Sequence, residues 1–168
     1  MYEQGFTIIE LMITLAVLAI IISMAAPSFV TMIQNNRATA VSNDLIASFQ
    51  LARTEAIKRN ATVSVQSTND STNWDGGHRI FIDPDRNGKF NAGELLLRNV
   101  DSPHSSITLT GTASDISYNN NGGVVAAATF TIDVDHAKCE SGVNHKVNSV
   151  QLGLSGSITL TTSRELCP

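Results

Sequence analysis

The sequence predicts an α+β fold, in which one long N-terminal helix packs against antiparallel β-sheets. Three observations carry this prediction. The segment from Leu11 to Val30 contains no Asp, Glu, Lys or Arg, a helical pattern continues after it, and β-rich runs fill the rest of the 168 residues. No segment is long enough to divide the β-rich part, so we expect one head domain after the helix.

The first element is the apolar segment from Phe6 to Val30. As a helix it would be about 37 Å long, enough to cross a hydrocarbon core of ~30 Å. A helix that is hydrophobic on every side for this length is typical of a membrane span rather than of a buried soluble helix. A secretory signal needs a basic start, which the leader of residues 1–5 lacks. We therefore expect a leader at residues 1–5 and a membrane-spanning helix at residues 6–30.

Glu10 interrupts this apolar segment with a carboxylate. An ionisable group inside a membrane costs about 2.5–3.5 kcal/mol and usually has a partner. The most available partner is an α-amino group created by cleavage after Gly5, on the same chain or on a neighbour.

The second element continues the helix from residue 31 to about Asn60. Its apolar residues recur at intervals of three and four, on one face: Val41, Leu45, Phe49, Ala52 and Ala56. This stripe needs a covering domain. We therefore expect a head at residues 31–168, consisting of the helix continuation at residues 31–60 and a β region at residues 61–168.

The β region divides into about eight strands separated by turn residues such as Asn87-Gly88 and Ser155-Gly156. The order in which these strands pair cannot be read from the sequence. The expected strands are Thr62–Gln66, Arg79–Asp83, Leu95–Val100, Ser106–Thr110, Ile116–Tyr118, Thr129–Val134, Ser149–Leu154 and Ser157–Thr161.

The run from Gly5 to Glu10, Gly-Phe-Thr-Ile-Ile-Glu, resembles the class III signal of type IV prepilins and type II secretion pseudopilins. The resemblance implies the pilin fold. It also implies that a prepilin peptidase cleaves between Gly5 and Phe6 and methylates Phe6. In this family the glutamate at the place of Glu10 pairs with a neighbouring subunit's amine during assembly, and a proline at the place of Pro27 kinks the helix.

The run from Leu51 to Asn60 is similar to the helix end of the GspH, FimT and FimU branch, and most like its FimU members. This resemblance implies a minor pilin that acts in assembly or priming at or near the tip of a type IV pilus. Its partners would be the peptidase, the major pilin and other minor pilins. The alternatives are a tip pseudopilin of a type II secretion system and a competence-type DNA-binding minor pilin.

The resemblance also sets the expected location. It implies a single-pass protein of the bacterial inner membrane with a periplasmic head, which later joins a fimbrium, the cell-surface pilus. Positive residues usually mark the cytoplasmic side of a span. Here the leader has none and the first is Arg37, so the orientation depends on the resemblance alone.

Cys139 and Cys167 are the two cysteines of the chain. The periplasm is oxidising, so we expect them to form a disulfide, as relatives in this branch commonly do. The alternatives are free thiols and a metal site that also uses His136 and His145, whose spacings match no zinc motif.

The segment from Asp83 to Glu94 fits the pattern of a calcium-binding loop. Oxygen-bearing side chains occupy loop positions 1, 3, 5, 9 and 12, with a glycine at position 6. They are Asp83, Asp85, Asn87, Asn91 and Glu94. The flanking segments read as strands rather than helices, however, and Asn87-Gly88 is a common hairpin turn. We expect a turn and no metal or other cofactor, with calcium as the alternative.

Catalysis and nucleic-acid binding lack their usual signals. There is no P-loop, no G-x-G-x-x-G and no G-x-S-x-G, so we expect no enzyme, and we expect the four histidines (78, 104, 136 and 145) on the surface. The DNA-binding relatives carry a Gly-Arg-x-Arg motif, and Gly156–Thr159 lacks both arginines. The region after Ala61 has seven Lys or Arg against eleven Asp or Glu, which disfavours binding to phosphate.

Overall fold

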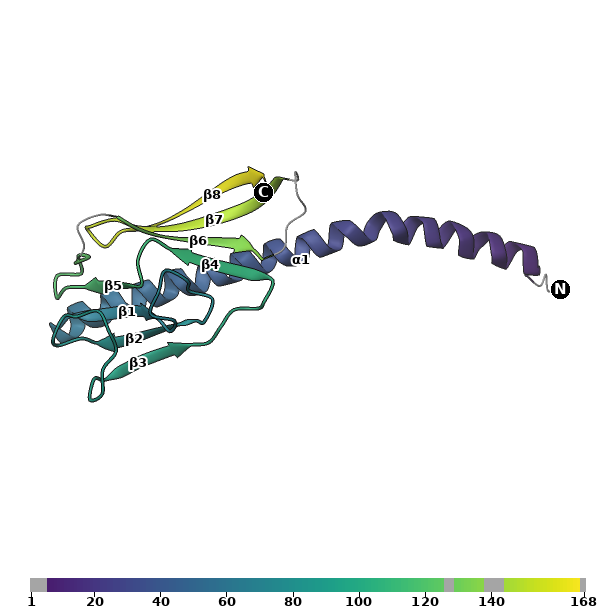
Figure 1. The fold of residues 1–168 in the computed structure, drawn as a ribbon. Coiled ribbons are helices and arrows are strands. Elements are labelled where there is room, and N and C mark those ends of the chain that lie inside the picture. The colour runs from purple at the N-terminus through teal and green to yellow at the C-terminus, as the bar shows by residue number, and fades with distance from the viewer. Residues whose placement is uncertain (1–5, 126–128, 138–143, 167–168) are drawn as a thin grey trace. The chain divides into compact units, whose positions relative to one another are not determined.

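The computed structural model describes residues 6–125, 129–137 and 144–166, with the side chains of residues 23–28 and 144 left aside. These residues form one helix, α1 (Ile8–Arg59), and eight strands (Figure 1). The α+β prediction is confirmed, and α1 ends within a residue of the expected limit. The strands are β1 (Val63–Ser67), β2 (His78–Ile82), β3 (Leu96–Val100), β4 (Ile107–Gly111), β5 (Asp115–Tyr118), β6 (Phe130–His136), β7 (Asn144–Leu152) and β8 (Ile158–Leu166).

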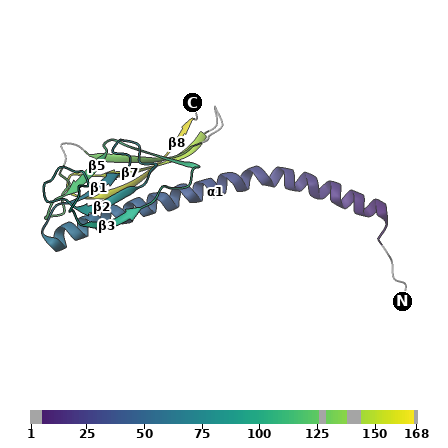
Figure 2. The same cartoon turned by 60° about the horizontal axis from the view of Figure 1, so that its bottom comes forward.

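The strands form two antiparallel four-stranded sheets. The first has the order β3-β2-β1-β5 and the second the order β4-β6-β7-β8. Figure 2 shows the sheets beside the C-terminal part of α1. The register of the second sheet is regular along β7 and β8, from Asn144 opposite Leu166 to Leu152 opposite Ile158.

The chain divides into two compact units, Met1–Asn35 and Asn36–Pro168. From Ile8 on, the described part of the first unit is helix. The second unit contains the last part of α1 and both sheets, and we call it the head.

The core of the head forms on the predicted face of α1. Leu45, Phe49, Ala52 and Ala56 are at most 1% exposed, and Val41 is partly buried against them. Since these positions recur with the helical period, one stripe of the helix contacts the apolar faces of the sheets. The amphipathic continuation of the helix is thereby confirmed.

Trp74 lies at the centre of this core although it belongs to the connection between β1 and β2. Its ring is 6.5 Å from that of Phe49 and 5.6 Å from that of Phe130. The indole Nε1 donates to the carbonyl of Ala113 at 2.9 Å, and the backbone N–H donates to the carbonyl of Leu109 in β4 at 2.9 Å. The ring also lies 6.1 Å from that of His78 in β2, so this one loop residue contacts the helix and both sheets.

The last two strands are longer than predicted. β7 begins at Asn144 rather than at Ser149, and β8 ends at Leu166 rather than at Thr161. The added residues are mostly polar. Those of β8 lie on an exposed edge strand, whereas those of β7 belong to an inner strand of the sheet.

Candidate functional site

The N-terminal part of α1 exposes its apolar side chains. Every large apolar side chain described between Phe6 and Ile33 is at least 50% exposed, and Phe6 reaches 84%. A contiguous apolar surface of this size is a binding surface rather than a stable water-exposed one. In the described ranges, no helix meets both the length and the hydropathy needed to cross a membrane. The span expected at residues 6–30 includes residues 23–28, whose side chains lie outside the described set.

The start of α1 is a capping box formed by Thr7 and Glu10. Glu10 Oε2 accepts from the backbone N–H of Thr7 at 2.9 Å, and Thr7 Oγ1 accepts from the backbone N–H of Glu10 at 3.2 Å. The Thr7 hydroxyl also donates to Glu10 Oε2 at 2.9 Å. Such reciprocal bonds satisfy amide groups that a helix start leaves unpaired. Glu10 thus has a local role that sequence reasoning missed, although the Thr-x-x-Glu spacing signals it.

Several predicted site residues cannot be placed by side-chain contacts. Gly5, Cys139 and Cys167 lie outside the described residues. Pro27 lies within α1, but its side chain is outside the described set. Cleavage at Gly5, methylation of Phe6, the kink at Pro27 and the disulfide therefore remain predictions.

The described residues next to the two cysteine-bearing segments lie at one end of the second sheet. The segment with Cys139 joins β6 to β7, and Cys167 directly follows β8. The first residue of β7, Asn144, pairs with the last residue of β8, Leu166. Both cysteines lie outside the described residues, so the disulfide stays a prediction.

Peptide mapping of periplasm-derived protein under non-reducing conditions should recover Cys139 linked to Cys167. A loop of about 29 residues closed in this way contributes roughly 3–4 kcal/mol to the free energy of unfolding. Reduction should therefore lower the denaturant midpoint and speed amide exchange in β7 and β8 more than in α1. Recovery of two alkylatable thiols from native protein would contradict the prediction.

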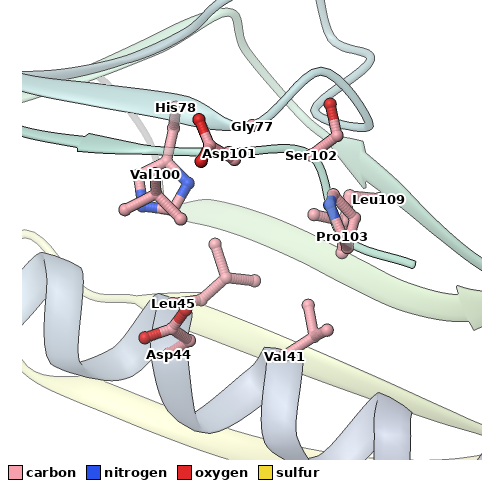
Figure 3. Close-up of a pocket in the computed structure, with 10 residues that line it drawn as sticks. All are labelled: Val41, Asp44, Leu45, Gly77, His78, Val100, Asp101, Ser102, Pro103 and Leu109. Carbon is pink, nitrogen blue, oxygen red and sulfur yellow. The ribbon is translucent and has the colours of Figure 1, made fainter.

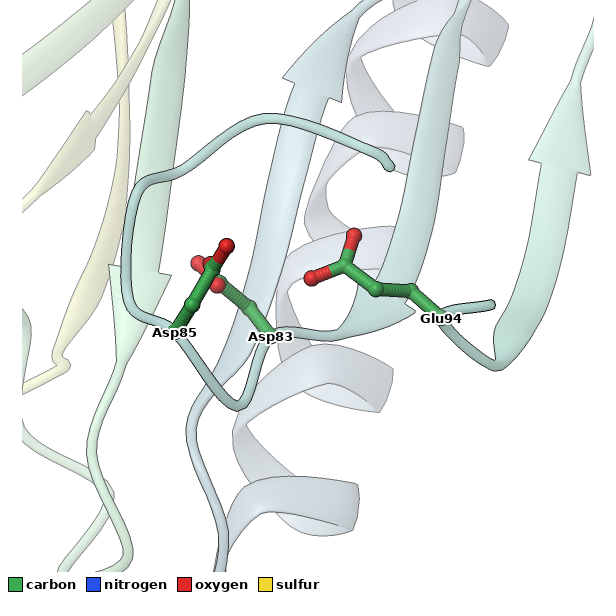
Figure 4. A group of neighbouring side chains, drawn as sticks. All are labelled: Asp83, Asp85 and Glu94. Carbon is green, nitrogen blue, oxygen red and sulfur yellow. The ribbon is translucent and has the colours of Figure 1, made fainter. Parts of the chain in front are cut away.

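The acidic loop between β2 and β3 brings three of its predicted oxygen ligands together. Carboxylate oxygens of Asp83, Asp85 and Glu94 all lie within 4.8 Å of one another, and Figure 4 shows the three groups facing each other. β2 and β3 pair antiparallel, so the loop closes a hairpin, as expected from its flanks. Gly88 adopts a φ of 73°, a left-handed conformation that glycine tolerates well.

Hydrogen bonds from the protein already occupy these carboxylates. Asp83 Oδ2 is buried and accepts from Ser64 Oγ at 2.6 Å and from the N–H of Gly88 at 2.9 Å. Asp85 accepts from the side-chain amides of Asn87 and Asn91 at 2.8 and 3.4 Å, and Glu94 accepts from the N–H of Asn91 at 2.7 Å. The carboxylates are thus satisfied by donors of the loop itself and by Ser64 of β1. Burial alone would raise the pKa of Asp83, but the bonds from Ser64 and Gly88 outweigh it and hold that pKa below its usual value.

Removal of calcium should not change the stability of the head. With the carboxylates satisfied by internal donors, neither EGTA nor millimolar calcium should shift the melting temperature, because no ion contributes binding free energy to the folded state. Differential scanning calorimetry of the full chain in detergent measures this. A reproducible calcium-dependent shift that Asp85→Ala abolishes would contradict it.

The expectation that all four histidines lie on the surface is wrong for two of them, which are buried. His78 is 2% exposed and His136 is 8% exposed. The His136 ring lies 6.2 Å from that of His145, whose Nε2 pairs with Asp135 at 2.7 Å. His104 is exposed and contacts Arg37 and Ser106. The sequence pattern could not reveal this burial, because histidine occurs in cores and on surfaces alike.

His78 lines a cavity of about 280 Å³ in the head, between α1 and the strands β2 and β3. Figure 3 shows Val41 and Leu45 rising from the helix toward the strand that carries His78. The cavity is mainly apolar, and the Nε2 of His78 has no hydrogen-bond partner among the described residues. Burial lowers the pKa of His78 to about 4; the nearby Asp44 opposes this shift and Arg98 adds to it.

The stability of the head should decrease as the pH falls from about 6.5 toward 4. Unfolded histidine binds a proton near pH 6.5, whereas folded His78 stays neutral until pH 4. The unfolded state therefore binds one more proton in this window, which costs about 1.4 kcal/mol per pH unit. Urea unfolding across this range should show a slope that His78→Leu reduces by that amount. An identical slope in the variant would contradict the prediction.

Two family models match separate parts of the chain. Residues 41–159 match the model of the family described as type II transport protein GspH. Residues 1–26 match the prokaryotic N-terminal methylation motif.

One relative and two solved structures resemble the chain. The pilin-like protein PilA1 of Thermus thermophilus is 30% identical over 96 residues, which cover 56% of this chain and 57% of PilA1; the match thus spans little more than half of that relative. The type IV minor pilin FimU of Pseudomonas aeruginosa matches in fold with a TM-score of 0.59 and 21% identity, over 76% of this chain and 90% of FimU. A second crystal form of FimU gives a TM-score of 0.56 at the same identity, over 73% and 91%.

Proposed function

Since the chain belongs to the GspH family, we propose that it is a minor pilin of a type IV pilus, acting in assembly or priming at or near the filament tip. The proposal rests on the presence of two family matches in one chain. The methylation motif covers residues 1–26 and the GspH match covers residues 41–159. The likeness to FimU supports the fold.

The proposed mechanism is assembly rather than catalysis. A prepilin peptidase cleaves between Gly5 and Phe6 and methylates Phe6. The helix then waits in the inner membrane with the head in the periplasm, and later joins the core of the filament with the helices of the major pilin and other minor pilins. The exposed apolar side chains from Phe6 to Ile33 support this step, because they need either lipid or equivalent helices around them.

When the helix moves from lipid into a helix bundle, the hydrophobic effect contributes little free energy, since both surroundings are apolar. Specificity must then come from packing and from polar pairs. Glu10 is the acidic group within this apolar surface, and a neighbour's α-amino group is the partner that the proposal assigns to it.

The mass and the location of the mature protein test the proposal. Filaments sheared from cells should contain this chain with an N-terminus at methylated Phe6. Deletion of the chain should reduce surface filaments and leave the membrane pool of the major pilin intact. Retention of Met1 in sheared filaments, or normal piliation in the deletion strain, contradicts the proposal.

A second candidate is a tip pseudopilin of a type II secretion system, which the description of the matching family favours. The same deletion strain separates the two candidates. Loss of exoprotein secretion with normal surface filaments identifies the secretion role. The third alternative is a DNA receptor. Gly156–Thr159 lacks both arginines of the DNA-binding motif, so we expect the protein to give no salt-sensitive gel shift with DNA.

A further inference from the structure

The cavity beside His78 has no part in the proposed function. It has a volume of about 280 Å³ and lies wholly within the head, between α1 and residues of β2, β3 and β4. In another protein, an engineered apolar cavity of about 150 Å³ binds benzene. The cavity of this head is therefore large enough to hold a molecule with an aromatic ring.

Apolar side chains from the helix and two strands form most of the cavity wall. Val41 and Leu45 come from α1, Val100 comes from β3 and Leu109 comes from β4. Leu45 and Leu109 are buried, so the inner wall is part of the core of the head. A trapped water needs about two to four polar partners, which such a wall does not offer. An apolar ring is the better occupant.

The inner wall carries one polar side chain, the imidazole of His78. Among the described lining residues, His78 is the one polar side chain that is buried, with 2% of its surface exposed. Figure 3 shows its ring extending from β2 toward Leu45 of the helix. The ring makes no hydrogen bond with another described residue. A buried polar group without a partner is unfavourable, so an occupant that bonds to this ring recovers the lost interaction.

The chemistry of His78 selects the polar group of the occupant. Burial lowers the pKa of His78 to about 4, so the imidazole is neutral at neutral pH. A neutral imidazole donates from one ring nitrogen and accepts at the other. A hydroxyl can also donate and accept, and it can therefore bond to either nitrogen. A charged ligand would lose its hydration against the apolar wall, which excludes an ion.

The mouth of the cavity is polar. Asp44, Asp101 and Ser102 are exposed there, and Asp44 accepts from Arg98 at 3.1 Å. None of the described lining residues is among the large apolar side chains that the head exposes. A partner protein that inserts a side chain usually buries apolar surface around it. The polar mouth therefore favours a free small molecule over the side chain of a partner.

We propose that this cavity binds a small neutral aromatic alcohol of the phenol class. The ring lies against Leu45, Val100 and Leu109, and the hydroxyl bonds to the imidazole of His78. The site does not depend on the proposed function, because all of its groups belong to the head and none takes part in assembly through α1.

Methyl-resolved NMR of the full chain in detergent micelles tests the site, with phenol and benzene as probes. The two probes have the same ring and differ by the hydroxyl. Phenol should cause saturable shifts at the methyl groups of Leu45, Val100 and Leu109 and show NOEs to them. Both probes also enter the micelle, so each affinity is referred to the free probe concentration outside it. Shifts that do not saturate, or that are confined to methyl groups before Asn36, overturn the proposal.

Two variants separate the hydrogen bond from the cavity. In His78→Leu the ratio of the phenol affinity to the benzene affinity should fall at least about tenfold, because the hydroxyl is then buried without a partner. Val41→Phe fills the cavity from the helix and keeps His78, so it should weaken both probes at least about tenfold. Unchanged methyl resonances of Val150 in β7 show that each variant is folded. An unchanged ratio in His78→Leu, or unchanged affinities in Val41→Phe, contradicts the proposed site.

A third probe, N-acetyltyrosinamide, carries the phenol group on a peptide backbone and represents the side chain of a partner. It should bind at least about tenfold more weakly than phenol, because its amide groups lose hydration at a mouth that offers no apolar surface in return. Binding as tight as that of phenol, or tighter, would assign the cavity to a tyrosine of another protein and overturn the proposal of a free ligand.

Discussion

Replacement of Trp74 by alanine is expected to lower the free energy of unfolding of the head by about 3–5 kcal/mol, the range for truncating a large buried aromatic. The side chain is fully buried and contacts both Phe49 and Phe130. Its loss leaves a large cavity and an unpaired carbonyl at Ala113. Since small domains are stable by about 5–15 kcal/mol, the variant should be near its limit of folding.

Urea unfolding followed by circular dichroism measures this loss, because the chain has a single tryptophan and the variant loses its fluorescence. Trp74→Phe is the control. It keeps an aromatic ring between Phe49 and Phe130 and removes the hydrogen bond, so its cost should be less than half that of alanine. A loss below about 1 kcal/mol for alanine, the typical cost of an average substitution, would show that Trp74 does not hold the core.

The helix could be predicted from the sequence because its signals are local and periodic. The spacing of Leu45, Phe49, Ala52 and Ala56 follows the helical repeat, and all four are buried. The pairing of the strands could not be predicted. β1 pairs with β2 and with β5, which begins at Asp115, and no local pattern encodes a contact across that much chain. The start of β7 and the end of β8 could not be predicted, because residues 144–148 and 162–166 are mostly polar and lack a clear apolar alternation.

The cluster of carboxylates in the acidic loop could be predicted because its residues are close in sequence, but the hydrogen bonding of the cluster could not. The spacing from Asp83 to Glu94 lies within one loop, and the structure does bring Asp83, Asp85 and Glu94 together. The hydroxyl that donates to Asp83 belongs to Ser64, in a different strand, and only the folded sheet brings it there. The burial of Trp74 and His78 likewise depends on packing between sheets and helix rather than on local sequence.

Glu10 has two roles in this account, a capping role that the structure shows and a pairing role that belongs to the proposed function. Glu10→Ala removes both, so it cannot separate them. Glu10→Gln keeps a capping box, because glutamine serves at this position as glutamate does, but it removes the charge. Thr7→Val removes the hydroxyl of the cap and keeps the charge.

We expect Glu10→Gln to reduce incorporation into filaments by at least about tenfold, the factor that 1.4 kcal/mol of lost pairing would give. Membrane insertion should be unaffected, since a neutral amide costs less than a carboxylate in lipid. Thr7→Val should incorporate nearly normally, because one exposed cap contributes only about 0.5–2 kcal/mol to a long helix. The measurement is the ratio of this chain in sheared filaments to that in membranes, by quantitative immunoblot. Normal incorporation of Glu10→Gln, together with failure of Thr7→Val, would assign the importance of Glu10 to the cap and contradict the pairing with a neighbour's amine.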